Sequence, residues 1–445
     1  MKGEFEMQLE KLYTVNIPTG VDLQETSAMC GDIGDQPNQR TFGAYIYINS
    51  HMEFQEIKGL GGAFSELGGK ALLSLTESDQ QQVASDLVKD KFSYFRLPVG
   101  ASDFALSEYS LDDHDDDFAM EYFSLERDHE YMIPYMNLLK KYAPEMELHA
   151  SPWSPPAWMK DTKKMAGGGG KLIDDPKYYE AYAKYFIKLV EEYKKLGFNI
   201  DRINVQNEPE ADPIFPGCNM DVFQMANLIK NYLVPAFKEA KLETEIFAGT
   251  FRTINEATAC EFLSENPGIE NYIDGIGVQY TTMQPLYNIL QNYPGMKIMH
   301  TESVCYRGEN TWPQAIALYM NVVNYLNAGC DTFTYWNMLL NEDAKSTWGW
   351  KQNSMITIDE ENKTYKHNPD YHVMALVCSC IKPGAKRIVY AARSKVGIAF
   401  KNPDGSIHFM ASNFLDREDV GTVTIDKETF ELKLDPFSIT AFRVK

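Results

Sequence analysis

Two glutamates, Glu208 and Glu302, each come two residues after the end of a short β-rich run of the chain. Glu208 follows the run 202–206 and precedes Pro209, which favours an extended backbone and ends the run. Glu302 follows the run 297–300. A pair of carboxylates across a cleft is the minimum that glycoside hydrolysis needs, one group with a raised pKa as acid and one ionised as nucleophile or base. A single glutamate is usually a solvated surface charge, but two at strand ends favour one shared site.

Tryptophans cluster after two of the short β-rich runs. Flat aromatic surfaces cover the C–H faces of sugar rings, while polar groups at their edges bind the hydroxyls. A single aromatic residue is more often part of the core, but a cluster of them at strand ends favours sugar binding. The clustered tryptophans are Trp153 and Trp158 after the third run, Trp336 at the end of the eighth run, and Trp348 and Trp350 in the next loop.

These residues need a scaffold, and the middle of the chain predicts one. Eight short β-rich runs alternate with helical stretches, such as 177–196, in which apolar residues recur near a 3.6 period. This order predicts an α/β fold, a (β/α)8 TIM barrel, whose chemistry lies where strands end and loops begin. The eight runs are 57–64, 92–99, 146–150, 202–206, 245–248, 273–278, 297–300 and 332–336.

The two ends of the chain have a different pattern. Short alternating strands are expected at 41–48, 422–425 and 437–444, with a turn at 402–405. We therefore predict three segments. Residues 1–55 and 383–445 form one β-sandwich side domain from both termini, and residues 56–382 form the catalytic barrel.

Composition excludes several classes of function. The 445 residues carry a formal net charge of −21, which repels nucleic-acid phosphates and anionic membranes. No apolar run approaches the length of a spanning helix, and the first residues lack the apolar stretch of a secretory signal, so we expect a cytoplasmic protein without membrane insertion. Seven cysteines and eight histidines show no metal-ligand spacing, so we expect no metal and no cofactor.

Six motifs, in order along the chain, resemble those of glycoside hydrolase family 30, which includes glucosylceramidases. The resemblance covers about residues 57–380 and implies a retaining mechanism on β-linked sugars, with Glu208 as acid/base and Glu302 as nucleophile. By position it also implies that Asp103, Trp153, Asn207 and Trp336 contact the sugar. The motifs are Gly59-Leu60-Gly61-Gly62-Ala63-Phe64, Arg96-Leu97-Pro98 with Ser102-Asp103-Phe104, Ala150-Ser151-Pro152-Trp153-Ser154-Pro155-Pro156, Gln206-Asn207-Glu208-Pro209, His300-Thr301-Glu302 and Tyr335-Trp336-Asn337.

Chemistry suggests roles for three more of these side chains. Asn207 can donate its amide to the sugar 2-hydroxyl, a contact that strengthens as positive charge develops on the ring. Asp103 can accept two hydroxyls at once, or it caps the following turn. Arg96 can keep Glu302 ionised, or it is buried for structural reasons.

The sequence departs from the family after the sixth run. The family often has His-Trp-Tyr there, with the tyrosine supporting the nucleophile, whereas this chain has Gln279-Tyr280-Thr281. Either Tyr280 reaches the site from a different angle, or Gln279 takes over the hydrogen bonds to substrate and nucleophile.

We therefore expect a retaining glycoside hydrolase that acts on β-linked saccharides or glycosides. Release of glucose from the ends of β-glucosides is the leading hypothesis. The alternatives on the same scaffold are an endo-β-1,6-glucanase, a β-xylosidase and a β-fucosidase. The alternative from a different class of function is a carbohydrate-binding barrel that does not catalyse a reaction.

Overall fold

The computed structural model describes residues 8–30, 43–89, 91–252, 258–303, 306–393 and 395–445. The chain divides into two compact units. The first comprises Met1–Leu60, Glu309–Asp331 and His367–Lys445, and the second comprises Gly61–Gly308 and Thr332–Lys366. The predicted domain boundaries after residues 55 and 382 remain predictions.

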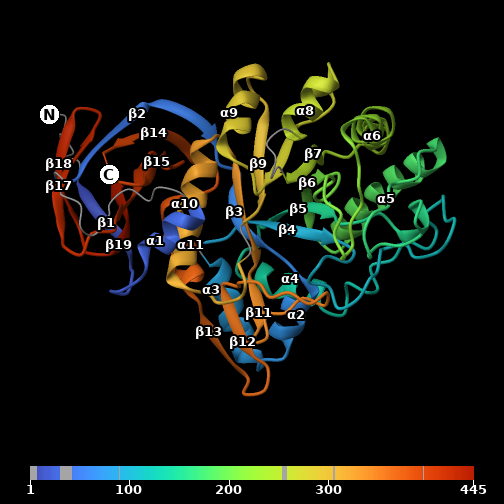
Figure 1. The fold of residues 1–445 in the computed structure, drawn as a ribbon, viewed down its shortest axis with the longest axis horizontal. Helices are drawn as coiled ribbons and strands as arrows, with labels where there is room; N and C mark the ends of the chain where they lie inside the picture. The colour runs from blue at the N-terminus through green and yellow to red at the C-terminus, as the bar shows by residue number, and fades with distance from the viewer. Residues whose placement is uncertain (1–7, 31–42, 90, 253–257, 304–305, 394) are drawn as a thin grey trace. The chain divides into compact units, whose positions relative to one another are not determined.

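The second unit is built on eight parallel strands (Figure 1). Their order in the sheet is β10-β3-β4-β5-β6-β7-β8-β9, and the hydroxyl of Thr332 in β10 donates to the carbonyl of His300 in β9 at 3.2 Å. The predicted TIM barrel is confirmed, and each predicted run overlaps one strand. The strands are β3 (Gly59–Ala63), β4 (Tyr94–Val99), β5 (Glu147–Pro152), β6 (Asn199–Asn204), β7 (Glu245–Arg252), β8 (Gly275–Gln279), β9 (Lys297–Glu302) and β10 (Thr332–Asn337).

Helices follow the strands as the periodicity predicts. The longest, α5 (Pro176–Lys195), begins after Asp175, whose carboxylate accepts from the backbone N–H of Lys177, and Pro176 suits the first turn. Its apolar face is buried, from Tyr178 to Val190. The other helices are α2 (Glu66–Leu73), α3 (Glu77–Val88), α4 (Met132–Lys140), α6 (Val222–Leu228), α7 (Val234–Ala240), α8 (Thr258–Glu265) and α9 (Met283–Asn292).

Glycines allow the barrel strands to approach each other closely. A Cβ on Gly61 in β3 would overlap the backbone carbonyl oxygen of Tyr94 in β4. A Cβ on Gly277 in β8 would overlap the side-chain oxygen of Asn204 in β6. These two strands therefore need residues without side chains at those positions.

The first unit contains one eight-stranded sheet in the order β1-β19-β16-β15-β14-β2-β17-β18, mostly antiparallel. The predicted β-sandwich is confirmed, because edge strand β18 also contacts β16 and β19, and residues of both layers share one core that includes Ile46, Phe409, Leu432 and Phe442. The strands are β1 (Leu9–Asn16), β2 (Tyr45–Glu56), β14 (Lys386–Ala392), β15 (Gly397–Lys401), β16 (Ile407–Asn413), β17 (Asp419–Ile425), β18 (Glu428–Leu434) and β19 (Ser438–Val444).

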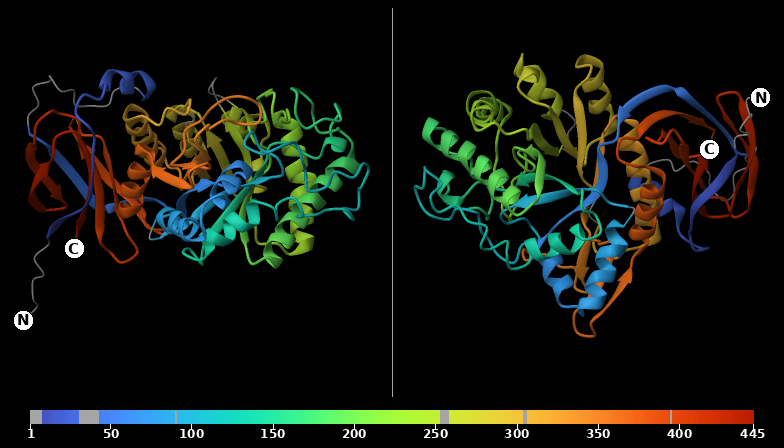
Figure 2. Two further views of the ribbon diagram at one scale, coloured as in Figure 1. Left: turned by 90° about the horizontal axis from the view of Figure 1, so that it is seen from below. Right: turned by 180° about the vertical axis from the view of Figure 1, so that it is seen from behind.

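Three helices also belong to this first unit. They are α1 (Leu23–Cys30), α10 (Trp312–Asn327) and α11 (Pro369–Cys380), and α10 packs against the other two (Figure 2). The predicted turn at 402–405 joins β15 to β16, with Gly405 at φ 83°. The predicted strand 41–48 corresponds to β2, although residues 41 and 42 lie outside the described residues.

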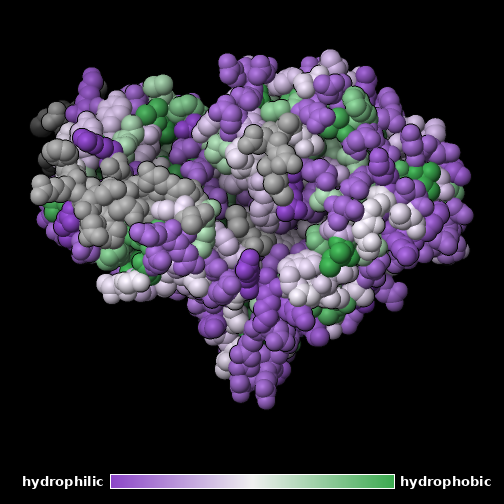
Figure 3. All heavy atoms as spheres, viewed as in Figure 1, coloured by the Kyte–Doolittle hydropathy of each residue, from purple (hydrophilic) through white to green (hydrophobic). Residues whose placement is uncertain are grey.

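A small third sheet follows the barrel strands. It consists of β11 (Leu339–Asn341), β12 (Ile356–Asp359) and β13 (Thr364–His367). The face in Figure 3 is mostly hydrophilic, with apolar residues in separate patches. Within the described ranges, every helix is too short or too polar to span a lipid bilayer.

Candidate active site

Glu208 and Glu302 lie at the carboxyl ends of β6 and β9, where a TIM barrel places its chemistry. Glu302 is the last residue of β9, and Glu208 comes four residues after the end of β6. Both residues are at least nine-tenths buried. The structure therefore places the predicted pair at the same edge of the sheet.

One amide joins the two carboxylates. The side-chain nitrogen of Gln279, at the end of β8, lies 3.0 Å from Glu208 Oε1 and 3.4 Å from Glu302 Oε2. The sum of these two distances is the upper limit on the separation of the two oxygens. The two carboxylates therefore come close enough to share one amide donor and to face a single sugar ring.

Two donors hold Glu302 from other directions. Arg96 in β4 is completely buried, and its Nη1 lies 2.6 Å from Glu302 Oε2. The hydroxyl of Tyr280 donates to Glu302 Oε1 at 2.6 Å and lies 3.1 Å from the carbonyl of Ser303. Gln279 and Tyr280 thus both support this carboxylate, and Arg96 is both buried and paired. One positive charge and hydrogen-bond donors on both oxygens therefore hold the Glu302 carboxylate in place.

Glu208 has a different electrostatic environment. Burial, followed by the nearby negative charge of Glu302, raises the pKa of Glu208 to about 7. Arg252, at the end of β7, opposes this rise from 3.6 Å, and so does the hydrogen bond from Gln279. A carboxyl group with a raised pKa can carry a proton near neutral pH, as a general acid must.

The backbone at Glu208 differs from our expectation. Pro209 was expected to hold the preceding residue extended, but Glu208 has φ 44°, in the left-handed region. Hydrogen bonds on both sides fix this conformation. The N–H of Glu208 donates to the carbonyl of Thr250 in β7 at 2.9 Å, and its carbonyl accepts from the N–H of Ala211 at 2.9 Å.

Asn207 presents one end of its amide to the site. Its Oδ1 accepts from Arg96 Nη2 at 2.7 Å, from the Thr250 hydroxyl at 3.2 Å and from Gln279 Nε2 at 3.3 Å. Its Nδ2 donates to no acceptor within the part of the chain that the structure describes. Three donors therefore fix the amide orientation and leave the NH2 group for a ligand.

Aromatic rings line the same region. The rings of Trp153 and Trp336 stack with centroids 5.1 Å apart at 25°, and the Arg96 guanidinium lies 4.5 Å from the Trp153 centroid. The buried indole nitrogen of Trp336 has no hydrogen-bond partner among the described residues. Trp158 is a core residue whose indole donates to the carbonyl of Asp112. The apolar cluster around the stacked pair is Ala63, Phe104, Trp153, Trp336, Leu340 and Ala344, with Leu67 and Phe215 packed against it.

Asp103 is buried in the loop after β4. Its carboxylate does not cap the following turn, because the Ser102 hydroxyl accepts from the N–H of Phe104 instead. No side chain among the described residues donates a hydrogen bond to the Asp103 carboxylate. Burial, followed by the negative charges of Glu302 and Glu208, raises the pKa of Asp103 well above its usual range. Its own backbone N–H donates to this carboxylate, and the hydroxyls of a ligand can supply further donors.

Two buried histidines in the barrel are neutral. Burial and the nearby Arg96 charge lower the pKa of His300 to about 3 and lower that of His149 well below its usual range. His300 stacks on Phe333 with centroids 4.1 Å apart, and His149 lies 3.1 Å from the Thr334 hydroxyl. Proton transfer near pH 7 therefore falls to the carboxyl groups.

Sequence reasoning missed several residues of the site. Arg252 faces Glu208, Thr250 donates to Asn207, and the Ser151 hydroxyl accepts from Arg96 Nε at 2.9 Å. All three lie one to four residues after the ends of the predicted runs 146–150 and 245–248, and this position was the available signal. No local pattern distinguishes such polar residues from ordinary loop residues.

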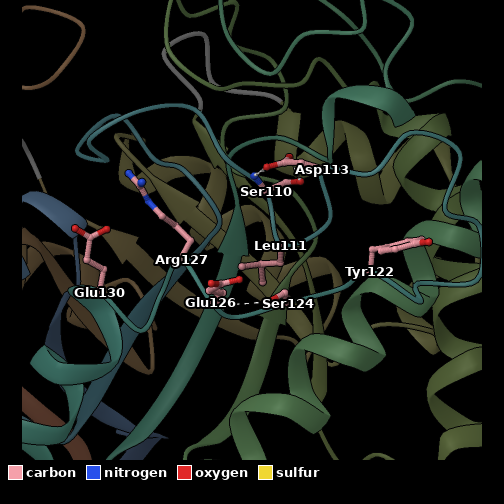
Figure 4. Close-up of a pocket in the computed structure, with 8 residues that line it drawn as sticks. All are labelled: Ser110, Leu111, Asp113, Tyr122, Ser124, Glu126, Arg127 and Glu130. Carbon is pink, nitrogen blue, oxygen red and sulfur yellow. Dashed lines mark hydrogen bonds between the residues drawn. The ribbon is translucent and has the colours of Figure 1, made fainter.

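A cavity of the second unit lies on the connection between β4 and α4 (Figure 4). It has a volume of about 510 Å3 and contains none of the predicted site residues. Its lining residues are Ser110, Leu111, Asp113, Tyr122, Ser124, Glu126, Arg127 and Glu130. In the described parts of the chain, no group of three or more His, Cys, Asp or Glu is placed to hold a metal ion.

Comparison with known proteins agrees with this geometry. A Caenorhabditis elegans protein provisionally named glucosylceramidase 3 is 28% identical over 367 residues, covering 77% of this chain and 70% of that protein. An endo-1,6-β-D-glucanase of Aspergillus fumigatus is 25% identical over 451 residues, covering 93% of this chain and 90% of that enzyme. A solved endo-β1,6-glucanase structure superposes with a TM-score of 0.81 at 26% identity, covering 91% of this chain and 95% of that one. Residues 57–379 match the sequence profile of the glycosyl hydrolase family 30 TIM-barrel domain. The chain therefore belongs to glycosyl hydrolase family 30 and is a retaining β-glycosidase.

Proposed function

We propose that this protein releases glucose from the ends of β-glucosides, with Glu302 as the nucleophile and Glu208 as the acid and base. The observation that carries this proposal is the bridging amide of Gln279, which contacts both carboxylates. The two groups differ in environment, since Arg96 pairs with Glu302 whereas burial raises the pKa of Glu208. Two carboxyl groups that lie in different environments can take different catalytic roles.

In the first step, a carboxylate oxygen of Glu302 attacks the anomeric carbon. The bond to the leaving oxygen breaks as Glu208 gives that oxygen its proton, and a covalent glycosyl-enzyme forms. Arg96 and Tyr280 hold the attacking carboxylate in place, which reduces the entropic cost of reaching the transition state.

In the second step, Glu208 must act as a base. The Glu302 charge is among the causes that raise the pKa of Glu208, and this charge disappears when Glu302 forms the ester. The pKa of Glu208 then falls, and its carboxylate takes a proton from the incoming water. The water oxygen bonds to the anomeric carbon from the face that the leaving group vacated, and the bond from that carbon to Glu302 breaks, so the carboxylate is restored and the β configuration is retained.

Two further groups are placed to bind the sugar, and the second favours a terminal one. The Nδ2 of Asn207 is left for the 2-hydroxyl, next to the carbon where positive charge develops. Asp103 is buried and has no side-chain donor among the described residues, and it suits two free hydroxyls at the far end of a sugar ring. A sugar linked through one of those hydroxyls would leave half of this acceptor unsatisfied.

The test combines two variants of the intact protein. Glu302→Ala should lower kcat/KM on nitrophenyl β-glucoside by about 10⁴-fold or more. Glu208→Ala should recover turnover of an activated aryl β-glucoside when azide is added, and the product should be the β-glucosyl azide. Equal rates for Glu302→Ala and the wild type would remove Glu302 from the mechanism, and an α-azide product would contradict the role of Glu208.

A second candidate is cleavage within β-1,6-linked glucan. Two of the compared proteins carry that activity in their names. The products distinguish the candidates, because an exo-acting enzyme releases only glucose from a β-1,6-glucan from the earliest time points. An endo-acting enzyme releases a mixture of oligosaccharides.

A further inference from the structure

We propose that Phe215 and Trp350 form an aromatic platform for a sugar leaving group. The proposal rests on the proposed function and adds the substrate class on the side of Glu208. Phe215 lies on the loop 209–220 after β6, and Trp350 lies on the loop 342–355 between β11 and β12. Their ring centroids are 5.1 Å apart with an interplanar angle of 55°.

Phe215 connects this platform to the sugar site. It packs against the apolar cluster that contains the stacked pair Trp153 and Trp336. It also follows Glu208 by seven residues, on the same connection between β6 and α6. Because Glu208 gives its proton to the leaving oxygen, atoms beyond that oxygen lie toward this loop. The platform therefore contacts the leaving group rather than the sugar that is released first.

The loop 209–220 is held in a fixed conformation. Its two ends are joined by a hydrogen bond from the N–H of Met220 to the carbonyl of Pro209 at 3.0 Å. The buried ammonium of Lys160 lies 2.5 Å from the Gly217 carbonyl. The N–H of Gly167 donates to the carbonyl of Ile214 at 3.0 Å, next to Phe215. The Phe215 ring is therefore presented by a preorganised loop.

The loop 342–355 is held in the same way. Its turn is closed by the N–H of Ser346, which donates to the carbonyl of Trp350 at 2.8 Å. The Thr347 hydroxyl donates to the carbonyl of Ala105, in the loop that carries Asp103. The bond from Thr347 joins the loop that carries Trp350 to the loop that carries Asp103. One substrate can therefore contact the platform and the sugar site at the same time.

The composition of the platform favours a sugar over a lipid chain. Phe215 and Trp350 are half-buried, which leaves part of each ring open to a ligand. Exposed acidic side chains of Glu210 and Asp212 stand on the same loop. Ile214 is the one large exposed apolar residue that the described parts of these two loops contain. Aromatic faces with polar neighbours match the C–H faces and hydroxyls of a second pyranose.

The test compares two substrates that differ only beyond the scissile bond. These are β-D-glucosyl fluoride, whose leaving group is too small to reach the platform, and the β-1,6-linked disaccharide of glucose. The measured quantity is the ratio of kcat/KM for the disaccharide to kcat/KM for the fluoride. We expect this ratio to fall at least about tenfold in Phe215→Ala and in Trp350→Ala. It should stay near the wild-type value in Phe215→Tyr, which keeps an aromatic face.

Phe223→Ala is the matched control, because Phe223 is 58% exposed at the start of α6, shortly after the same loop. Its ratio should equal that of the wild type. Unchanged ratios in both platform variants, or an equal fall in the control, would overturn the platform. A larger loss on octyl β-glucoside than on the disaccharide would overturn the sugar assignment. A wild type that does not hydrolyse the fluoride would overturn the proposed function, and the platform with it.

Discussion

Removal of the Arg252 charge should move the pH profile of the enzyme upward. Arg252 Nη1 lies 3.6 Å from Glu208 Oε2, and its positive charge lowers the pKa of Glu208. Two unit charges at about 4 Å interact by about 1 kcal/mol in water and by about 4 kcal/mol at an effective dielectric constant of 20. Since the Arg252 side chain is 38% exposed, we use the aqueous value. At about 1.4 kcal/mol per pH unit, this corresponds to about 0.7 pH units.

The sign follows from the proposed role of Glu208 as an acid. Its protonated form is the active one, and Arg252→Gln removes a charge that favours the ionised form. The basic limb of the kcat/KM profile, which reports the free enzyme, should therefore move to higher pH by about 0.7. Lys195→Gln is the control, because it removes an exposed charge that pairs with Glu192 on α5. A limb that stays in place or moves to lower pH in Arg252→Gln would refute the reasoning.

Three other changes test different parts of the structure. Tyr280→Phe removes the 2.6 Å hydrogen bond to Glu302 and should lower kcat/KM about 10-fold to 150-fold with unchanged circular dichroism; an unchanged rate would exclude Tyr280 as a support. Asp103→Ala should lower kcat/KM on nitrophenyl β-glucoside about 100-fold, and a change below about threefold would contradict its contact with sugar hydroxyls. Gly61→Ala brings a Cβ against the Tyr94 carbonyl and should lower the free energy of unfolding by about 3 kcal/mol in urea titration. If Gly61→Ala were as stable as the wild type, β3 and β4 would be able to move apart.

The barrel could be predicted from the sequence because its signals are local. The run 245–248 predicts β7 and the stretch 177–196 predicts α5, since apolar periodicity decides each element separately. The pairing of β1 with β19 joins the two ends of the chain, and no local pattern contains such a contact. The small sheet β11-β12-β13 was not predicted, because strands of three or four residues carry too little alternation.

The place of the proposed catalytic pair was predictable for the same reason, but its supporting contacts were not. Strand ends identify Glu208 and Glu302, whereas Arg252 looks like any basic residue at the end of a strand. The sequence left open whether Gln279 or Tyr280 supports Glu302, and the structure shows that both do. Side-chain direction depends on backbone angles that composition does not reveal.

Backbone strain at two residues shows how the site is assembled. Glu208 and Tyr280 have φ values of 44° and 50°, in a region that costs a residue with a side chain about 1–3 kcal/mol. Each of the two directs a functional group at the carboxylate pair, Glu208 its own carboxyl group and Tyr280 its hydroxyl. An extended backbone at either position would turn the side chain to another direction, because side-chain direction follows the backbone. The strain is therefore the conformational cost of bringing both groups to Gln279 and Glu302, and neighbouring strands offset it through bonds such as that from Glu208 to Thr250.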